Sequence, residues 1–284
     1  MPSEPLVTAL MPVHEYRDDF LQSAVSSLVR QSSRSWRALV IVEPSRRTVF
    51  EAILATTAED SRFRLIENEG RKLAGAFNTG MRHADTEFVA ILLADDMWAP
   101  DAVAVLEREI RSRPDVDFFH SARRVIDDDG HEISSIHSAR HDVVLADFQL
   151  HSPCKHLLCW RRAKGLAVGG MDESLNSIGP DDLDFPWTMA EAGATFGAID
   201  ECLYLYRDHR GHYRLTTHLP RNVQRRELAR IYRKHRLPRK LARQRLRAAT
   251  RSHLRQCLYR TELEKRFRQA LGLEATRVWR QSYR

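Results

Sequence analysis

The sequence predicts an α/β protein, with a Rossmann-like, mostly parallel sheet flanked by helices and a basic helical C-terminal extension. Short apolar runs alternate with amphipathic stretches over the first 100 residues, a pattern typical of β-α-β units that build a parallel sheet. The charge also divides along the chain. Residues 221–284 hold 21 Lys and Arg against 4 Asp and Glu, whereas residues 1–220 hold 24 against 34. We therefore expect a first domain over 1–216 and a separate extension over 217–284.

The elements of the first 100 residues follow in a regular order. Strands are expected at 6–11, 38–42, 63–66 and 88–93, and helices at 18–29, 48–58 and 73–83. The strands are continuous apolar runs, which indicates that helices cover both faces of the sheet. In the first helix, Leu21, Val25 and Leu28 recur at helical spacing after Asp18, which can cap a helix N-terminus. Ligands of such sheets bind at the carboxyl ends of the strands, so the residues after each strand are the first candidates for a site.

The composition excludes several classes of protein. With 12 Gly, 11 Pro and 29% charged residues among 284, the chain is expected to fold rather than to be disordered or collagen-like. No apolar run reaches the roughly 18 residues of a membrane span, and the N-terminus lacks a signal-peptide pattern. The four cysteines, Cys154, Cys159, Cys202 and Cys257, lack zinc-site spacing, and we expect reduced thiols. We therefore expect a cytoplasmic protein.

Polar and acidic side chains follow three of the predicted strands. The segment 12–15 (Pro-Val-His-Glu) follows the first strand, 43–45 (Glu-Pro-Ser) follows the second, and Asp95 and Asp96 follow the fourth. Two adjacent carboxylates repel each other, so a divalent cation is their natural partner. The alternative is that the pair caps the next helix, although residues 100–101 (Pro-Asp) already supply a start for that helix.

In this order of motifs the chain resembles the family 2 glycosyltransferases, which have the GT-A fold. The resemblance covers most of residues 5–210. The segments that carry it are Pro12–Glu15, Asn68–Gly70, Ala76–Gly80, Leu92–Asp96, Arg161–Arg162, Gly169–Glu173, Gly179–Asp184 and Tyr206–His209. It implies a nucleotide-binding half over about 1–100 and an acceptor half over about 101–216.

The resemblance implies an inverting, metal-dependent glycosyltransferase that moves one sugar from a nucleotide-diphosphate sugar to a hydroxyl of a glycan, glycolipid precursor or small metabolite. It places Mg²⁺ or Mn²⁺ at Asp95 and Asp96, with His209 completing the coordination, where the ion stabilises charge on the leaving diphosphate. The acceptor hydroxyl needs a carboxylate base. Asp182 matches that position, with Asp181 as the second choice. The alternatives are a structural role for this acidic cluster, at the start of the following helix, and a surface position for His209.

The same resemblance suggests which residues contact the donor. They are Pro12, His14, Glu15, Glu43, Arg71, Asn78, Asp95 and Arg207. Arg207 offers a permanent positive charge to phosphate. Arg71 could do the same, and its alternative is a solvated loop charge. In the acceptor half, Asp127–Gly130 is typical of a hairpin turn. The histidines nearby are expected to be hydrogen-bonded loop residues rather than a second metal site; they are His131, His137, His141, His151 and His156.

The extension is expected to form two or three short amphipathic helices, with breaks at Pro238 and Gly272 and apolar positions at Leu254, Leu258, Leu263, Phe267 and Leu271. Residues 221–284 either attach the protein peripherally to an anionic membrane surface or bind a polyanionic acceptor. Alternatively, they pack on the acidic first domain and offset its charge. No nucleic-acid partner is expected, because no nucleic-acid recognition motif accompanies the positive charge. The sequence leaves open whether the chain forms a homo-oligomer. The second function class is a non-catalytic glycan- or polyanion-binding protein on a degenerate GT-A scaffold.

Overall fold

The structure is a computed structural model that describes residues 4–14, 17–48, 50–51, 60–175, 180–208, 220–260 and 270–271, with the side chains of 252–260 left aside. The strands are β1 Val7–Val13, β2 Trp36–Val42, β3 Phe63–Glu67, β4 Phe88–Ile91, β5 Met97–Trp98, β6 Phe118–Ile126, β7 Leu158–Arg161 and β8 Phe196–Arg207. The helices are α1 Asp18–Val29, α3 Lys72–His83, α4 Ala102–Ser112, α5 Leu145–Phe148, α6 Arg162–Ala167, α7 Phe185–Glu191, α9 Arg221–Lys234 and α10 Arg239–Arg260.

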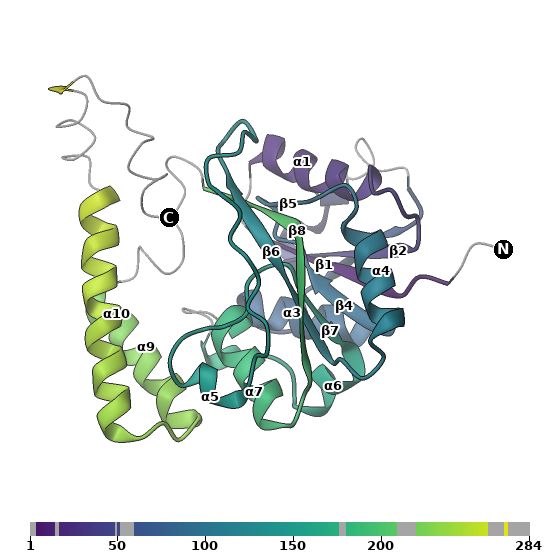
Figure 1. Cartoon of the computed structure of the whole chain (residues 1–284). Helices are drawn as coiled ribbons and strands as arrows, with labels where there is room; N and C mark the ends of the chain where they lie inside the picture. The colour runs from purple at the N-terminus through teal and green to yellow at the C-terminus, as the bar shows by residue number, and fades with distance from the viewer. Residues whose placement is uncertain are drawn as a thin grey trace.

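The strands form one mixed sheet in the order β3-β2-β1-β4-β7-β6-β8-β5 (Figure 1). The first four strands of the chain run parallel to one another, as the sequence predicts. β7 is antiparallel to both β4 and β6, β8 runs parallel to β6, and the short β5 is antiparallel to β8. The carboxyl ends of β1 to β4 therefore meet at one edge, and β5 and β8 lie beside the turn that follows β4.

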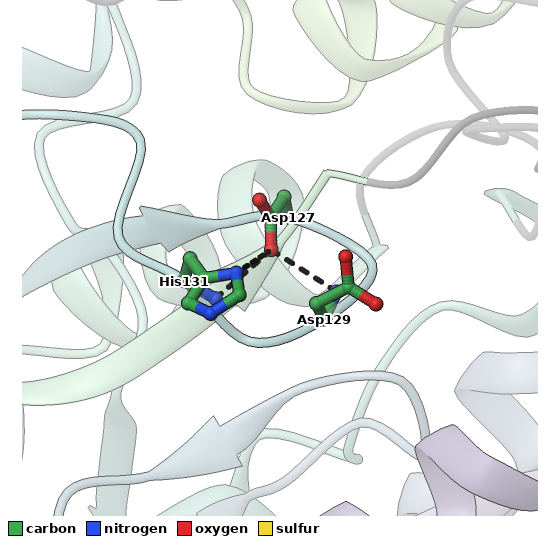
Figure 2. A group of neighbouring side chains, drawn as sticks. All are labelled: Asp127, Asp129 and His131. Atoms are coloured by element: carbon green, nitrogen blue, oxygen red, sulfur yellow. Dashed lines mark hydrogen bonds and ion pairs between the residues drawn. The ribbon is translucent and has the colours of Figure 1, made fainter.

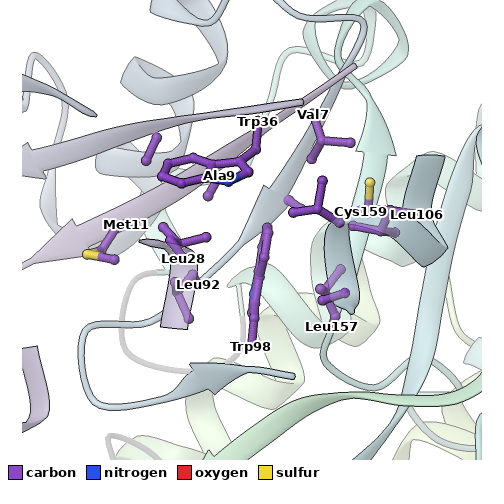
Figure 3. Close-up of a cluster of buried hydrophobic side chains, with 14 of the residues drawn as sticks. Val7, Ala9, Met11, Leu28, Trp36, Leu92, Trp98, Leu106, Leu157 and Cys159 are labelled. Atoms are coloured by element: carbon purple, nitrogen blue, oxygen red, sulfur yellow. The ribbon is translucent and has the colours of Figure 1, made fainter. Parts of the chain in front are cut away.

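Helices cover both faces of the sheet. One face packs on α1 and α4 through a core that includes Val25, Trp36, Trp98 and Leu106 (Figure 3). The other face packs on α3, α7 and α9 through a second core. Burial of both faces explains why the central strands read as unbroken apolar runs. The predicted strands and the helices near 18–29 and 73–83 are confirmed, whereas the predicted helix at 48–58 lies mostly outside the described residues.

The C-terminal helices pack against the first domain with their inner faces. α9 contributes Leu228, Ile231 and Tyr232 to the second core, and α10 lies beside α9 (Figure 1). Arg245 of α10 contacts the carbonyl of Phe148 in α5 and the ring of Trp187 in α7. Pro238 separates the two helices, as predicted. The predicted apolar positions beyond residue 251, and the break at Gly272, lie outside the described side chains, apart from Leu271, which is exposed.

Two further expectations can be compared with the described residues. Cys154, Cys159 and Cys202 are free thiols, in keeping with the expectation of reduced cysteines. Burial raises the pKa of the Cys154 and Cys159 thiols well above its usual value. Among the described helices, none combines the length and the apolar character that a bilayer crossing demands.

Candidate functional site

The carboxyl ends of β2 and β3 are joined by a small polar network. Asn68, directly after β3, donates from its amide to the Glu43 carboxylate at 3.1 Å and to the Lys72 carbonyl at 3.1 Å. Its backbone N–H donates to Val42, the last residue of β2. Glu43 therefore lies at the edge of the sheet where the sequence places it. His14, after β1, is exposed, and its carbonyl accepts a bond from Arg46 at 2.7 Å.

Asp95 and Asp96 form the turn between β4 and β5. Asp96 is 1% exposed, and both of its carboxylate oxygens accept hydrogen bonds. Oδ2 accepts from the Tyr204 hydroxyl at 2.7 Å, and Oδ1 accepts from the backbone N–H of Arg207 at 2.7 Å. Burial, and then the neighbouring charge of Asp95, raise the pKa of the Asp96 carboxyl well above its usual range. Asp95 is only half-buried, so it is the more accessible carboxylate of the two.

The Arg207 side chain fixes the turn that contains Asp95 and Asp96. The side chain is 4% exposed, and its Nε donates to the Asp95 carbonyl at 2.8 Å. Its Nη1 donates to the carbonyls of Asp127 and Asp128, both at 2.8 Å, and its guanidinium lies 4.5 Å from the ring centroid of Phe20. Burial lowers the pKa of Arg207. The structure therefore directs these nitrogens to the protein's own carbonyls.

The carboxylates at this turn have the chemistry of a site for Mg²⁺ or Mn²⁺. Hard carboxylate oxygens are the ligands that these ions prefer. Among the described residues, no group of three carboxylate, imidazole or thiol ligands forms at Asp95 and Asp96. Further ligands would have to come from the donor diphosphate or from residues outside that part of the chain, where His209 and Glu15 both lie.

A group of Asp127, Asp129 and His131 does bring metal-ligand atoms within 4.8 Å of one another (Figure 2). It is the predicted hairpin turn, with Gly130 at φ +84°. Asp127 Oδ1 accepts from the backbone N–H groups of Asp129 at 3.0 Å and His131 at 2.9 Å. The cluster is therefore explained by the turn itself.

The acidic segment Asp181–Asp184 lies in a π-helical turn, residues 180–184, that leads into α7. Asp181 is buried and lies 3.3 Å from His156 Nε2. Asp184 is 1% exposed and is bound by Lys234 at 2.6 Å and His235 at 2.9 Å, both in or next to α9. Asp181 and Asp184 are thus fixed by partners, whereas the Asp182 carboxylate makes no side-chain hydrogen bond or ion pair among the described residues.

The Asp182 carboxyl has the electrostatic character of a general base. Burial, and then the charge of Asp181, raise its pKa to about 6. The charges of His156, Arg123 and Lys155 act in the opposite direction. A carboxylate with this pKa is ionised at neutral pH and still accepts a proton readily, which is what proton abstraction from a hydroxyl requires.

One chain of contacts joins the two acidic regions. The Tyr204 hydroxyl donates to Asp96, and the Tyr204 ring packs on His156 with centroids 5.2 Å apart. His156 in turn contacts Asp181. The turn after β4 and the segment around residue 182 are therefore neighbours. Neither Tyr204 nor His156 was singled out for this role by the sequence, because an apolar strand and a loop histidine carry no motif.

Two predicted donor residues lie at the junction of α3 with the acceptor half. Asn78 is buried, and its amide accepts from Met171 N–H at 2.7 Å and donates to the Met171 carbonyl at 2.9 Å. Gly170 has φ +76°, and a Cβ there would lie 2.3 Å from Asn78 Oδ1, so only glycine fits. Arg71 is exposed at the start of α3, and its backbone N–H donates to Glu173 at 2.8 Å. Pro12 is half-buried within β1.

Comparison with known proteins decides the family. Residues 8–164 match the model of glycosyl transferase family 2. The chain belongs to this family. It is 27% identical over 207 residues to the O-antigen biosynthesis protein RfbC of Myxococcus xanthus, and the match covers 72% of this chain and 16% of RfbC.

It is also 33% identical over 94 residues to the Escherichia coli glucosyltransferase WfgD, covering 33% of this chain and 36% of WfgD. The chain therefore spans much less than two thirds of these two relatives. The solved mannosyltransferase PcManGT of Pyrobaculum calidifontis, in complex with GDP-Man and Mn²⁺, superposes with a TM-score of 0.58 at 17% identity. The match covers 98% of this chain and 83% of PcManGT. At 17% identity this similarity shows the fold alone. The chain therefore has the GT-A fold.

Proposed function

We propose that this family 2 protein is an inverting, metal-dependent glycosyltransferase that moves a single sugar from a nucleotide-diphosphate sugar to an acceptor hydroxyl. The observation that carries the proposal is the contact chain Asp96–Tyr204–His156–Asp181, because it sets the candidate metal carboxylates and the candidate base at neighbouring positions. A donor bound across them would present its anomeric carbon between the two regions.

Asp182 is the proposed base. It takes the proton of the acceptor hydroxyl as that oxygen attacks the anomeric carbon from the side opposite the diphosphate. Its raised pKa of about 6 suits this transfer. One base and one displacement invert the anomeric centre. Asp181, bound to His156, is proposed to position the turn and to raise the pKa of Asp182.

Asp95 and Asp96 are the proposed ligands of Mg²⁺ or Mn²⁺, which would neutralise charge on the leaving diphosphate. In this proposal Asp95 is the carboxylate exposed to the donor, while Asp96 is oriented by Tyr204 and by the Arg207 backbone. In this proposal the Arg207 guanidinium fixes the turn through its bonds to backbone carbonyls and does not contact the donor phosphate. The PcManGT complex contains Mn²⁺ with GDP-Man, which supports a metal of this kind.

The proposed donor site is the edge formed by the ends of β1 and β2. Glu43, held by Asn68, is placed to contact the ribose or base, next to His14 and Pro12. His209 and Glu15 stay proposals from the sequence, since they lie outside the described residues. The name of WfgD states transfer from UDP-Glc to GlcNAc-diphosphoundecaprenol, and we propose an acceptor of the same broad type, a glycolipid precursor.

Attachment to a membrane is proposed to run through α10. Arg239, Arg243, Arg247 and Arg251 recur every four residues and are all exposed, while the opposite face of the helix packs on the protein. Like charges at this spacing destabilise a helix by roughly 0.2–0.5 kcal/mol per pair, which an anionic surface at the cytoplasmic membrane face would relieve. Family membership does not favour the non-catalytic alternative.

The central experiment compares Asp182→Asn with the matched variant Asp181→Asn. Donor binding is followed as a thermal shift with UDP and GDP, each with and without Mn²⁺, and turnover as release of nucleoside diphosphate. Asp182→Asn should lose at least ~100-fold in turnover and keep its Mn²⁺-dependent thermal shift. Asp181→Asn should retain more activity. Turnover by Asp182→Asn at the parent rate would contradict the assignment of the base.

A further inference from the structure

Two cationic side chains near Asp182 form no ion pair among the described residues, although the charge of Asp182 acts on both. Arg123 comes from β6 and Lys155 from the segment before β7, and both are half-buried. Among the described residues, no carboxylate lies within ion-pair distance of either side chain. The Nε of Arg123 is buried without any hydrogen-bond acceptor, an arrangement that costs roughly 1–3 kcal/mol when nothing compensates it.

Both cations are placed by the same contacts that join the acidic regions. Arg123 lies opposite Tyr204 in the register of β6 and β8, and its guanidinium lies 5.1 Å from the ring centroid of Tyr206. Lys155 directly precedes His156, whose ring packs on Tyr204. Arg123 is thus held against β8, and Lys155 approaches from the loop that contacts the π-helical turn.

The electrostatics around Arg123 and Lys155 favour the binding of an anion. Burial, and then the charge of Arg123, lower the pKa of Lys155. Burial, followed by the charges of Arg123 and Lys155, lowers the pKa of His137 as well. Two like charges held together in a partly dry region raise each other's energy. An anion bound between them would remove this cost and give the buried Arg123 nitrogen an acceptor.

We propose that Arg123 and Lys155 form an anion subsite beside Asp182, which binds a phosphate or diphosphate group carried by the acceptor. An arginine fork and a lysine ammonium are the two side chains that recognise phosphate oxygens best. The inference rests on the proposed function and deepens it: the accepting sugar hydroxyl is delivered to the base by a neighbouring phosphate. The donor diphosphate is assigned to the other side, at Asp95.

A binding experiment tests this subsite without turnover. Inorganic pyrophosphate is titrated by calorimetry, in EDTA at pH 8, into the full chain and into Arg123→Gln, Lys155→Gln and Arg123→Lys. The matched control is Arg124→Gln, because Arg124 is the next residue of β6 and is already paired with Glu132. Circular dichroism and the thermal midpoint establish that each variant is folded.

The expected result is binding by the full chain that weakens at least tenfold in Arg123→Gln and in Lys155→Gln. Arg124→Gln should bind within twofold of the parent. Arg123→Lys should retain more affinity than Arg123→Gln, because it keeps the charge. UDP, at a concentration that its own titration in EDTA shows to be saturating, should leave the pyrophosphate affinity unchanged, since the nucleotide occupies the donor side.

Two results would overturn the proposal. Equal affinity in the parent and both glutamine variants would remove the subsite, and displacement of pyrophosphate by UDP would assign the cations to the donor diphosphate. Hydrolysis of UDP-glucose and GDP-mannose by the parent is measured separately. An enzyme without any such turnover would contradict the proposed function while the pyrophosphate result still decided the subsite.

A kinetic comparison separates binding from a purely electrostatic role. If the two cations only adjusted the pKa of Asp182, their removal would shift the acid limb of the pH profile and leave the acceptor KM unchanged. A subsite predicts instead a rise in KM for a sugar 1-phosphate acceptor, with little change for the corresponding methyl glycoside. A shifted acid limb with equal KM values for both acceptors would reject the subsite.

Discussion

The ring of Tyr204 packs on the ring of His156 while its hydroxyl binds Asp96. One side chain of β8 therefore contacts both the turn after β4 and the loop that positions Asp181. This contact explains how carboxylates more than 80 positions apart in the chain come to lie in neighbouring regions. It also makes Tyr204 the residue through which a change at one region reaches the other.

Removal of the Tyr204 hydroxyl should destabilise the protein. Tyr204→Phe leaves Asp96 Oδ2 buried without its donor, which costs about 1–3 kcal/mol. Urea unfolding of Tyr204→Phe, Asp96→Asn and the double variant measures the coupling between the two residues. We expect the double variant to be less destabilised than the sum of the single variants. Additive losses would show that this bond contributes nothing specific.

The pH dependence of activity should follow Asp182. A base with a pKa of about 6 is protonated below that pH, so kcat/KM should fall about tenfold per pH unit below 6 and level off above it. The measurement is a pH profile of nucleoside diphosphate release from pH 4.5 to 9. A flat profile through pH 6, in a protein that stays folded, would exclude Asp182 as the base.

The same raised pKa predicts a stability effect of opposite sign. Because the folded state raises the pKa of Asp182 from 3.8 to about 6, it favours the protonated carboxyl. The stabilisation is present below the unfolded pKa and is lost as the pH rises through 6. Asp182→Asn, which cannot ionise, should therefore be more stable than the parent at pH 8, by at most about 3 kcal/mol. Thermal unfolding at pH 5 and pH 8 measures the difference, which should shrink at the lower pH.

Asp184 should be a strong determinant of stability. It is buried and bound by Lys234 and His235, and His235 also stacks on Trp187 with centroids 4.2 Å apart. Asp184→Ala removes the buried carboxylate that Lys234 and His235 share and should cost about 3 kcal/mol. The control is Asp172→Ala, which removes a more exposed partner of the same Lys234 at 3.4 Å and should cost less. Equal losses would reject a special role for Asp184.

Membrane attachment should depend on the arginine stripe of α10. Replacing Arg239, Arg243, Arg247 and Arg251 by Gln removes four exposed charges, each worth about 1 kcal/mol near an anionic bilayer. Binding to vesicles with 30% phosphatidylglycerol should fall roughly 100-fold or more. In the parent it should weaken with added salt. Sedimentation with vesicles measures both effects.

The matched control for this experiment is a second set of four exposed arginines, Arg30, Arg34, Arg37 and Arg64. It lowers the net charge equally and should retain most of the binding. Substitution is preferable to deletion of the extension, because α9 buries Ile231 and Tyr232 in the core. Equal losses of vesicle binding in the two variants would show that net charge, and not the arginine stripe of α10, determines attachment.

The parallel half of the fold could be predicted from the sequence because its signals are local. Continuous apolar runs such as 38–42 are typical of strands covered on both faces, and Pro238 is poorly tolerated inside a helix, so it separates α9 from α10. The acids at the ends of β2 and β4 followed from strand direction alone. The hairpin at Asp127–Gly130 was equally local, since Gly130 supplies the positive φ that the turn needs.

The partners of these acids could not be predicted, since they depend on which distant strands become neighbours. The pairing of β8 with β5 and β6 brings Tyr204 to Asp96, and no spacing in the chain encodes this arrangement. Arg207 and Asn78 illustrate the same limit. Their residue types suit phosphate or ribose, but the fold surrounds them with carbonyls of the protein itself.

The bond between Asp184 and His235 has a consequence for the order in which the protein is made. β1 to β4 and their helices are complete within the first 92 residues, so a nascent chain can assemble the nucleotide half early. The turn that bears Asp182 gains its anchor only after residue 235 has been synthesised. An unfinished polypeptide on the ribosome would thus acquire the proposed donor-binding edge before the proposed base, Asp182, is fixed in place.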